Sequence, residues 1–150
     1  MQTAYEEAFH GVNHNHGGPF GAVIVLDGKI VGRGHNRVLE SKDPTAHAEI
    51  NAIRDASQNL QHFHLEGSEI YTTCEPCPMC MSAIYWAKIE KVYYCLDRFD
   101  AEKIGFGDNH IYKELSKIPA ERMIEFKQVK NVNVQGLVGL WQNKNDRLIY

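Results

Sequence analysis

Two short runs of residues, far apart along the chain, most restrict how this sequence folds. Residues 44–49 spell Pro-Thr-Ala-His-Ala-Glu, and residues 74–80 spell Cys-Glu-Pro-Cys-Pro-Met-Cys. They offer one imidazole and three thiols spaced three residues apart, which are the donor groups that proteins use to bind zinc. Any fold of this chain that uses them together must bring His47 next to Cys77 and Cys80.

Cys77 and Cys80 are expected at the start of a helix. Pro78 suits the first turn of a helix, and the apolar run over residues 81–87 follows it. Residues three apart lie on the same helix face. The unpaired N–H groups and the positive end of the helix dipole favour anionic sulfur. We therefore expect both cysteines to be thiolates.

His47 is expected near the start of a second helix. Asp43 and Pro44 are interpreted as its N-cap and first-turn proline, ahead of a helical run over residues 46–56. Three protein ligands favour catalytic zinc, because a structural site closes its shell with a fourth. Two thiolates weaken the acidification of a bound water, so a nearby base would assist. Glu49, in the same helical turn, is the expected proton shuttle.

Other interpretations of the cysteines are weaker. A Cys-x-x-Cys pair alone is commonly a structural zinc knuckle or a redox pair. A structural site has no use for an unliganded glutamate beside its histidine, and a redox pair does not need the histidine. Cys74 is a conceivable fourth ligand, but its place after a strand over residues 68–73 favours a buried neutral thiol. Cys95 is expected in a strand without chemistry.

The composition is that of one globular domain spanning residues 1–150. The formal net charge is −3, and the basic residues are scattered, which argues against nucleic acid as the main partner. No apolar run is long enough to span a bilayer, and residues 1–7 lack the features of a signal peptide. Clustered cysteines suit a reducing compartment. We therefore expect a cytoplasmic protein with no membrane association.

Alternating helical and strand patterns predict an α/β fold. The Asp27-Gly28 turn predicts an antiparallel hairpin, and the crossover helices that follow predict parallel strands with both metal-binding helices at one carboxyl-end edge of the sheet. The expected helices cover residues 2–14, 46–56, 77–87, 111–115 and 134–141. The expected strands cover residues 20–26, 29–35, 68–73 and 91–96, with a further strand ending the segment 118–129, and residues 97–109 are expected to be rich in turns.

For several polar side chains, spacing alone indicates no function. His14 and His16, beside two glycines at a helix end, are expected to be solvated surface, as are His62 and His64 in a polar connection. Asp108 in its loop is expected to be a turn former, and the terminal residue to be frayed.

Further motifs accompany the two metal-binding runs along the chain. They are residues 17–25 (Gly-Gly-Pro-Phe-Gly-Ala-Val-Ile-Val), residues 84–87 (Ile-Tyr-Trp-Ala), Gly-Phe at 105–106 before Asp108, residues 111–114 (Ile-Tyr-Lys-Glu) and the terminal tyrosine. His-x-Glu followed by Pro-Cys-x-x-Cys is typical of zinc-dependent nucleobase deaminases. The chain resembles the bacterial guanine deaminases, within the cytidine deaminase-like superfamily, essentially from end to end.

This resemblance implies a three-layer α/β/α fold with a central mixed five-stranded sheet. It implies one Zn²⁺ per subunit, held by His47, Cys77 and Cys80. It also implies a homodimer in which the C-terminal segments are exchanged, so that Tyr150 enters the active site of the neighbouring subunit.

The resemblance further implies a binding pocket for a small purine base. Phe20 and Asn36 would line it with Trp86 nearby, and Asp108 would hydrogen-bond the purine and assist proton transfer. Gly107 stands where the family often has another aspartate. The chain departs from the family pattern at this point, directly beside Asp108.

The expected activity is that of a hydrolase acting on a cyclic amidine C–N bond, converting guanine to xanthine and ammonia. Water activated by zinc and Glu49 would attack C2, and Glu49 would then protonate N3 and the leaving amino group. The alternatives are a tRNA adenosine, cytosine, cytidine or guanosine deaminase, or a zinc-stabilised binding protein without catalysis.

Overall fold

The computed structural model describes residues 1–130 and 132–149. These residues form two compact units, Met1–Ile111 and Tyr112–Tyr150, which are described separately. The first unit contains the sheet and the site.

The sheet has the strand order β2-β1-β3-β4. Its strands are β1 (Gly21–Leu26), β2 (Lys29–His35), β3 (Glu69–Cys74) and β4 (Lys91–Leu96). Strand β1 is antiparallel to both β2 and β3, while β3 is parallel to β4. Strands β2, β3 and β4 therefore run in one direction, as the crossover pattern predicts. Asp27 and Gly28, with φ of 50° and 74°, form the predicted tight turn between β1 and β2.

The prediction of a fifth strand is wrong for the part of the chain that the structure describes. Residues 118–129 contain the 3₁₀ turn η1 (Pro119–Glu121) and otherwise irregular backbone. Ile124 and Phe126 alternate with charged residues, which is typical of a strand. A strand also needs a neighbour with which to exchange backbone hydrogen bonds, and this segment pairs with none of the four.

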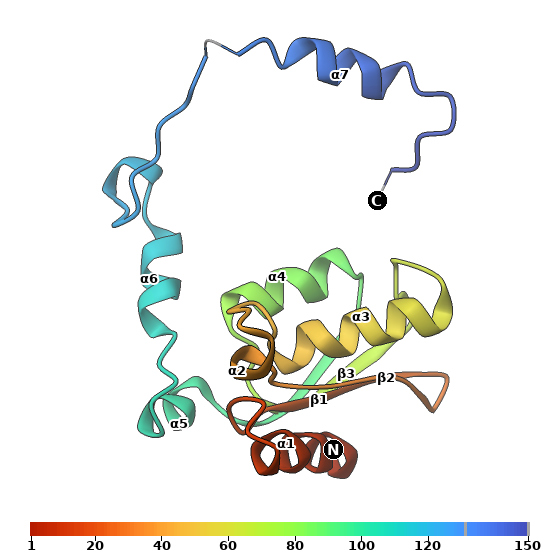
Figure 1. The fold of residues 1–150 in the computed structure, drawn as a ribbon, viewed down its shortest axis with the longest axis vertical. Coiled ribbons are helices and arrows are strands. Elements are labelled where there is room, and N and C mark those ends of the chain that lie inside the picture. Colours follow the sequence, from red (N-terminus) through yellow and green to blue (C-terminus); the bar gives the residue numbers. More distant parts are fainter. Residues whose placement is uncertain (131, 150) are drawn as a thin grey trace. The chain divides into compact units, whose positions relative to one another are not determined.

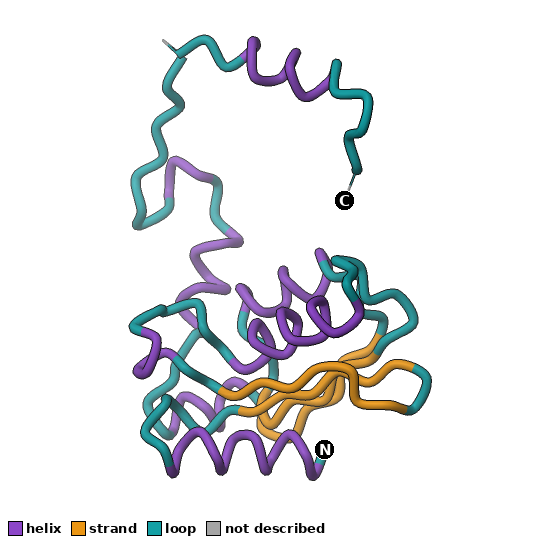
Figure 2. The backbone as a smooth tube through the Cα atoms, turned by 45° about the vertical axis from the view of Figure 1, so that its right-hand side comes forward, coloured by secondary structure: helices purple, strands orange, loops and turns teal. Residues whose placement is uncertain are grey.

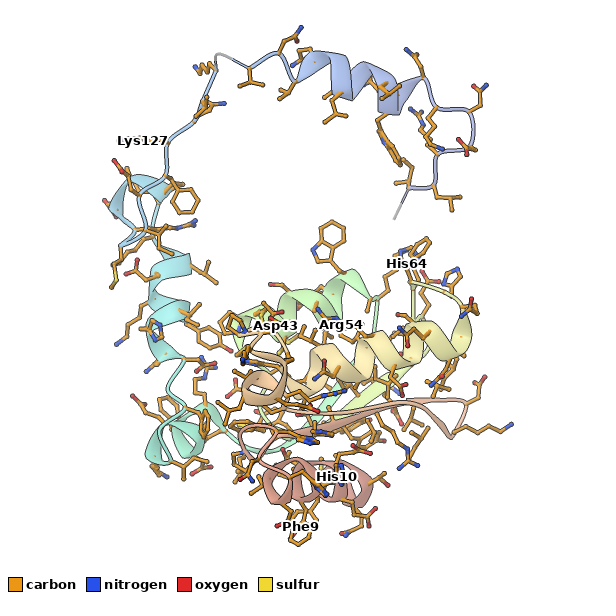
Figure 3. The ribbon with its side chains drawn as sticks, in the orientation of Figure 1. Phe9, His10, Asp43, Arg54, His64 and Lys127 are labelled. Carbon is orange, nitrogen blue, oxygen red and sulfur yellow. The ribbon has the colours of Figure 1, made fainter. Side chains whose placement is uncertain are left out.

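Helices cover both faces of the sheet, giving the predicted three layers (Figures 1 and 2). Helix α1 (Gln2–Asn13) lies on one face, and α3 (Ala48–Leu60) and α4 (Pro78–Trp86) lie on the other. Phe9 on α1 points away from the sheet and is 58% exposed (Figure 3). The core between the sheet and α3 and α4 contains fully buried Ile24, Ile70 and Ile84.

Helix α3 lies directly on the backbone of β2. A Cβ atom at Gly34 would stand 2.4 Å from the carbonyl oxygen of Ala48, and one at Gly32 would stand 2.4 Å from that of Ala52. Real Cβ atoms do not approach backbone so closely, so these positions require glycine. The same approach requires small side chains on the facing side of the helix.

The segment expected to be rich in turns includes a helix, α5 (Arg98–Lys103). Asp97 is its N-cap and accepts hydrogen bonds from the backbone N–H groups of Phe99 and Asp100, each at 2.9 Å. The Asp100 carboxylate accepts a hydrogen bond from the N–H of Asp97 at 3.3 Å, which completes a capping box. Asp97 and Asp100 are therefore the residues that start this helix.

The remaining helices are short. They are α2 (Val38–Ser41), α6 (Asn109–Ser116), which includes the predicted helix at 111–115, and α7 (Gln135–Gln142), which corresponds to the predicted final helix. His62 is exposed as predicted, but the side chain of His64 is only 14% exposed. No helix in the described residues is long and apolar enough to cross a membrane.

Candidate active site

The two metal-binding runs meet because each forms the start of a helix on the same side of the sheet. Strand β2 leads through α2 to α3, and β3 leads directly to α4. His47 is the N-cap of α3 and Cys77 is the N-cap of α4. Because β2 and β3 run in the same direction, both helix starts lie at the carboxyl-end edge of the sheet, as predicted.

The predicted cap of the first metal-binding helix is wrong. Helix α3 begins at Ala48 rather than at residue 46. The carboxylate of Asp43 accepts hydrogen bonds from the backbone N–H and the hydroxyl of Thr45, at 2.8 and 2.7 Å. Asp43 therefore closes a local turn before the helix, a competing use of the same residue type.

His47, Cys77 and Cys80 form a ligand set that fits zinc. Their donor atoms all lie within 4.8 Å of one another, and Nδ1 of His47 lies 3.6 Å from Sγ of Cys77 and 3.5 Å from Sγ of Cys80. Tetrahedral zinc with sulfur at about 2.3 Å and nitrogen at about 2.0–2.1 Å places those ligands about 3.6 Å apart. The site therefore has nearly the dimensions that the ion requires.

Cys74 is not part of this set. It is buried, and its thiol donates a hydrogen bond to the carbonyl oxygen of Asp97 at 3.7 Å. Burial raises the pKa of Cys74 to about 11. It is therefore the buried neutral thiol that its position after a strand predicts. Cys95 lies on β4, also as predicted, and is exposed.

The two ligand thiols differ in charge. The adjacent Cys80 thiol and a hydrogen bond from His47 favour the anionic form of Cys77 and lower the pKa of Cys77 to about 4. The interaction with Cys77, together with burial and the nearby Glu49, raises the pKa of Cys80. Without a metal, the protein's own groups therefore favour the thiolate form at Cys77 but not at Cys80, although both were expected to be thiolates. A metal cation bound to the Cys80 sulfur would displace its proton and so produce the second thiolate.

Glu49 is buried, with only 6% of its surface exposed. Its Oε2 atom accepts a hydrogen bond from the Cys80 thiol at 3.4 Å. Burial raises the pKa of Glu49 to about 7. A carboxyl group that changes protonation near neutral pH, beside a metal-binding triad, is suited to accept and return protons.

A pocket brings most of the predicted site residues together. It is lined by residues from the loops before and after the strands, from the end of β3, from the first turn of α3 and from α5. The predicted residues in it are Phe20, Asn36, His47, Glu49, Cys77 and Asp108. Trp86, at the end of α4, is 68% exposed and is not among the lining residues. Tyr150 lies outside the described residues.

Asn36 is held in a fixed orientation. It is 4% exposed, and its Oδ1 atom accepts hydrogen bonds from the N–H groups of Gly18 and Val38 at 3.3 and 3.2 Å. A Cβ atom at Gly17 would stand 2.0 Å from this oxygen. With its oxygen bound to backbone, the amide NH₂ group of Asn36 is the part left for a ligand.

Asp108 presents an unsatisfied acceptor. Its Oδ1 atom is buried and has no hydrogen-bond partner within the described residues. Burial, and then the negative charge of Cys77, raise the pKa of Asp108. Buried carboxylate oxygens are normally paired, so this atom is suited to accept a hydrogen bond from a ligand.

Sequence reasoning missed two contributions to the pocket. Arg98 binds Glu75 through Nη2 to Oε1 at 2.8 Å and through Nε to Oε2 at 3.2 Å. Phe106 packs edge-on against Phe20, with ring centroids 4.9 Å apart. The position of Glu75 between two motif cysteines was an available signal, whereas nothing near Arg98 in the sequence indicated that its helix returns to the site.

The chain belongs to the cytidine and deoxycytidylate deaminase family. Residues 1–96 match the family model described as the cytidine and deoxycytidylate deaminase zinc-binding region. This places the metal triad and Glu49 in a known class of zinc-dependent deaminases.

Within that class, guanine deaminase from Bacillus subtilis is 48% identical over 143 residues, covering 95% of this chain and 92% of that protein. A crystal structure of guanine deaminase from the same organism matches with a TM-score of 0.94 and 46% identity, over 99% of this chain and 95% of that one. A tRNA-specific adenosine deaminase from Aquifex aeolicus is 51% identical over 76 residues, about half of each chain.

Proposed function

We propose that this protein catalyses the zinc-dependent hydrolysis of guanine to xanthine and ammonia. The observation that carries the proposal is one pocket lined by two residues of a three-ligand zinc set, His47 and Cys77, by a buried glutamate with a pKa near neutrality and by an aspartate whose buried oxygen has no hydrogen-bond partner within the described residues. Similarity to a guanine deaminase along 95% of this chain, at 48% identity, supports the choice of substrate. Similarity to the tRNA deaminase covers only about half the chain.

His47, Cys77 and Cys80 would hold one zinc ion per subunit. When bound, zinc supplies Lewis acidity that lowers the pKa of water enough to make a nucleophile near neutral pH. Glu49 takes a proton from the attacking water and delivers it to N3 of guanine. It then transfers the second proton to the amino nitrogen at C2, so that ammonia leaves and the carbonyl of xanthine forms.

The pocket walls would orient the base for this attack. The NH₂ group of Asn36 donates a hydrogen bond to an acceptor on the purine edge, and Oδ1 of Asp108 accepts one from a purine N–H. Asp108, whose pKa is also raised, assists proton transfer at that edge. Phe20 and Phe106 form an aromatic wall against the ring. Trp86 lies outside the pocket lining, so it has no part in orienting the base here.

We further propose that the protein is a homodimer with exchanged C-terminal segments and that Tyr150 completes the site of the partner, so that residues 1–150 act as one deaminase domain. On α7, Leu137 and Leu140 are 69% and 70% exposed and Trp141 is 42% exposed. Exposed apolar side chains grouped on one helix need a surface to cover them. The ligand thiols of Cys77 and Cys80 must stay reduced to bind zinc, and we propose the cytoplasm as the compartment that keeps them so.

Ammonia release from guanine, guanosine, adenine, cytosine and cytidine by the zinc-loaded protein tests the substrate. We expect guanine to be turned over in clear preference to the others. Preference for another base or nucleoside would refute the roles of Asn36 and Asp108 while leaving the zinc chemistry intact. A tRNA anticodon stem-loop tests the adenosine deaminase alternative, and inactivity on every substrate would favour a non-catalytic binding protein.

Mixing two inactive variants tests the exchange. One variant is Glu49→Gln with the full C-terminus, and the other lacks residues 148–150 but keeps Glu49. If the segments are exchanged, a mixed dimer has one site with the intact glutamate of one chain and the intact terminus of the other. Co-refolding the two variants should then restore activity, whereas each refolded alone stays inactive. An inactive mixture that contains mixed dimers would refute the exchange.

A further inference from the structure

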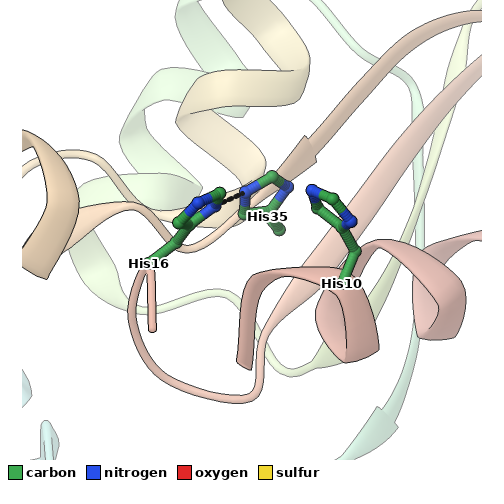
Figure 4. A group of neighbouring side chains, drawn as sticks. All are labelled: His10, His16 and His35. Carbon is green, nitrogen blue, oxygen red and sulfur yellow. Dashed lines mark hydrogen bonds between the residues drawn. The ribbon is translucent and has the colours of Figure 1, made fainter. Parts of the chain in front are cut away.

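Three histidines form a cluster outside the pocket (Figure 4). His10 lies on α1, His16 lies in the loop that follows it, and His35 is the last residue of β2. One nitrogen of each lies within 4.8 Å of the other two. The interpretation of His16 as solvated surface is wrong, since its side chain is 21% exposed and faces His35.

We propose that these three histidines form a second metal site, selective for a divalent transition metal such as Zn²⁺. Imidazole nitrogen is a preferred ligand of such ions, and three imidazoles with an open fourth position are a known zinc ligand set. The site is built from residues other than those of the pocket, and the proposal does not depend on the substrate.

The distance between the rings is close to what a metal requires. Nδ1 of His16 lies 2.9 Å from Nε2 of His35. Two nitrogens bound to one tetrahedral zinc ion at about 2.0–2.1 Å are about 3.3–3.4 Å apart. A small separation of the two rings therefore replaces their mutual hydrogen bond with two bonds to a shared ion. His10 lies at the open side of the cluster and is exposed, so it has freedom to turn toward the ion.

Carboxylates face the nitrogens on the far side of the rings. Nδ1 of His35 lies 3.2 Å from Oε2 of Glu7, and Nε2 of His16 lies 3.7 Å from Oε1 of Glu40. Histidines that bind metals usually donate their other ring N–H to a carboxylate, which fixes the tautomer and makes the ligand nitrogen more basic. This arrangement leaves the inward nitrogens as the ligand atoms, and it distinguishes the cluster from histidines that only meet by chance.

The protein backbone makes room for this arrangement. A Cβ atom at Gly11 on α1 would stand 2.8 Å from Cδ2 of His35. Glycine at this position lets the imidazole lie against the helix, where the side chain of His35 is only 13% exposed. Metal bound here would join the end of α1 to the end of β2, one residue before Asn36 of the pocket.

Equilibrium dialysis of tag-free, zinc-loaded protein against free Zn²⁺ tests the proposal. The wild type should bind about two zinc ions per chain, and the variant His10→Gln/His16→Gln should bind about one. The retained ion in the variant shows that its fold and its thiolate site are intact. His62→Gln is the matched control, because it removes an exposed imidazole elsewhere and should still allow about two.

A second variant tests the carboxylate contact without removing a ligand. Glu7→Gln should weaken binding at the second site by about tenfold to a hundredfold. Co²⁺ added to the zinc-loaded protein should give d–d absorption without the thiolate charge-transfer bands that Cys77 and Cys80 would produce. Saturation of the wild type at about one ion per chain, or an unchanged second ion in the double histidine variant, would overturn the proposal.

Discussion

Replacing Glu49 by glutamine should reduce the turnover of guanine strongly without removing the zinc ion or destabilising the fold. Glutamine has nearly the same shape but neither accepts nor returns a proton in this role. Positioned general acid–base groups typically contribute about 10²–10⁴-fold to rate, and Glu49 is proposed to act in more than one transfer, so we expect the turnover of guanine to fall by at least that factor. The site formed by His47, Cys77 and Cys80 should still hold about one zinc ion per chain, because Glu49 is not in this ligand set.

The same substitution should stabilise the fold. The unfolded chain releases the Glu49 proton at the ordinary pKa of 4.5, whereas the buried group keeps it up to a pKa of about 7. The free energy of unfolding therefore falls as the pH rises through this interval, by up to roughly 3 kcal/mol. Glutamine carries no charge to bury, so the variant should be more stable than the wild type above pH 7 and similar to it near pH 4.

Denaturant unfolding at several pH values, with and without a chelator, measures this difference. The gain should be largest after chelation, because a bound cation favours the ionised carboxylate and offsets part of the cost of burial. Glu66→Gln is the control, since Glu66 is exposed and paired with Lys88, and such surface changes are usually within about 0.5 kcal/mol.

Two results would refute this reasoning. Substantial guanine turnover by Glu49→Gln would show that another group carries the protons. A wild type and a variant whose unfolding free energies change with pH in parallel would show that Glu49 is not buried as an ionisable group with a raised pKa.

Four further outcomes are expected. Cys77→Ala should lose zinc and unfold at lower denaturant concentration, as metal analysis and unfolding curves would show. The rate of the wild type should fall on the acid side with an apparent pKa between 4.5 and about 7, because Glu49 must be ionised to accept a proton; an unchanged rate down to pH 4 would contradict this. Gly17→Ala should displace the side chain of Asn36 and raise KM for guanine, since the added Cβ would stand 2.0 Å from its Oδ1. Removing residues 148–150 should reduce activity with zinc retained, and a fully active truncated protein would count against a role for Tyr150.

The sequence predicted the metal site because its signals are local. Cys77 and Cys80 are three residues apart beside a proline, and His47 and Glu49 lie two residues apart, so few geometries satisfy both runs. The hairpin at Asp27-Gly28 was equally local. Its positive φ angles at both positions match the residue types that adopt them.

The parts that the sequence did not predict depend on tertiary contacts. The alternation around Ile124 is compatible with a strand, but no sequence pattern says whether a neighbouring strand is present. Arg98 reaches the pocket only because α5 follows β4 and brings it to Glu75. The histidine cluster joins a helix, a loop and a strand end, and His35 had no motif of its own.

The contact of Gly32 and Gly34 with α3 has a consequence for how this protein can change during evolution. Any larger side chain at either glycine would push away helix α3, whose start carries His47 and Glu49, so substitutions at these two positions would disturb the metal-binding end of the site. The loop that carries Phe106 and Asp108 is less tightly packed, because a Cβ atom at Gly107 would come no closer than 3.3 Å to the side chain of Glu102, although Gly105 needs glycine for its φ of 93°. New substrate preferences should therefore arise through substitutions in this loop, while the reaction itself stays constant.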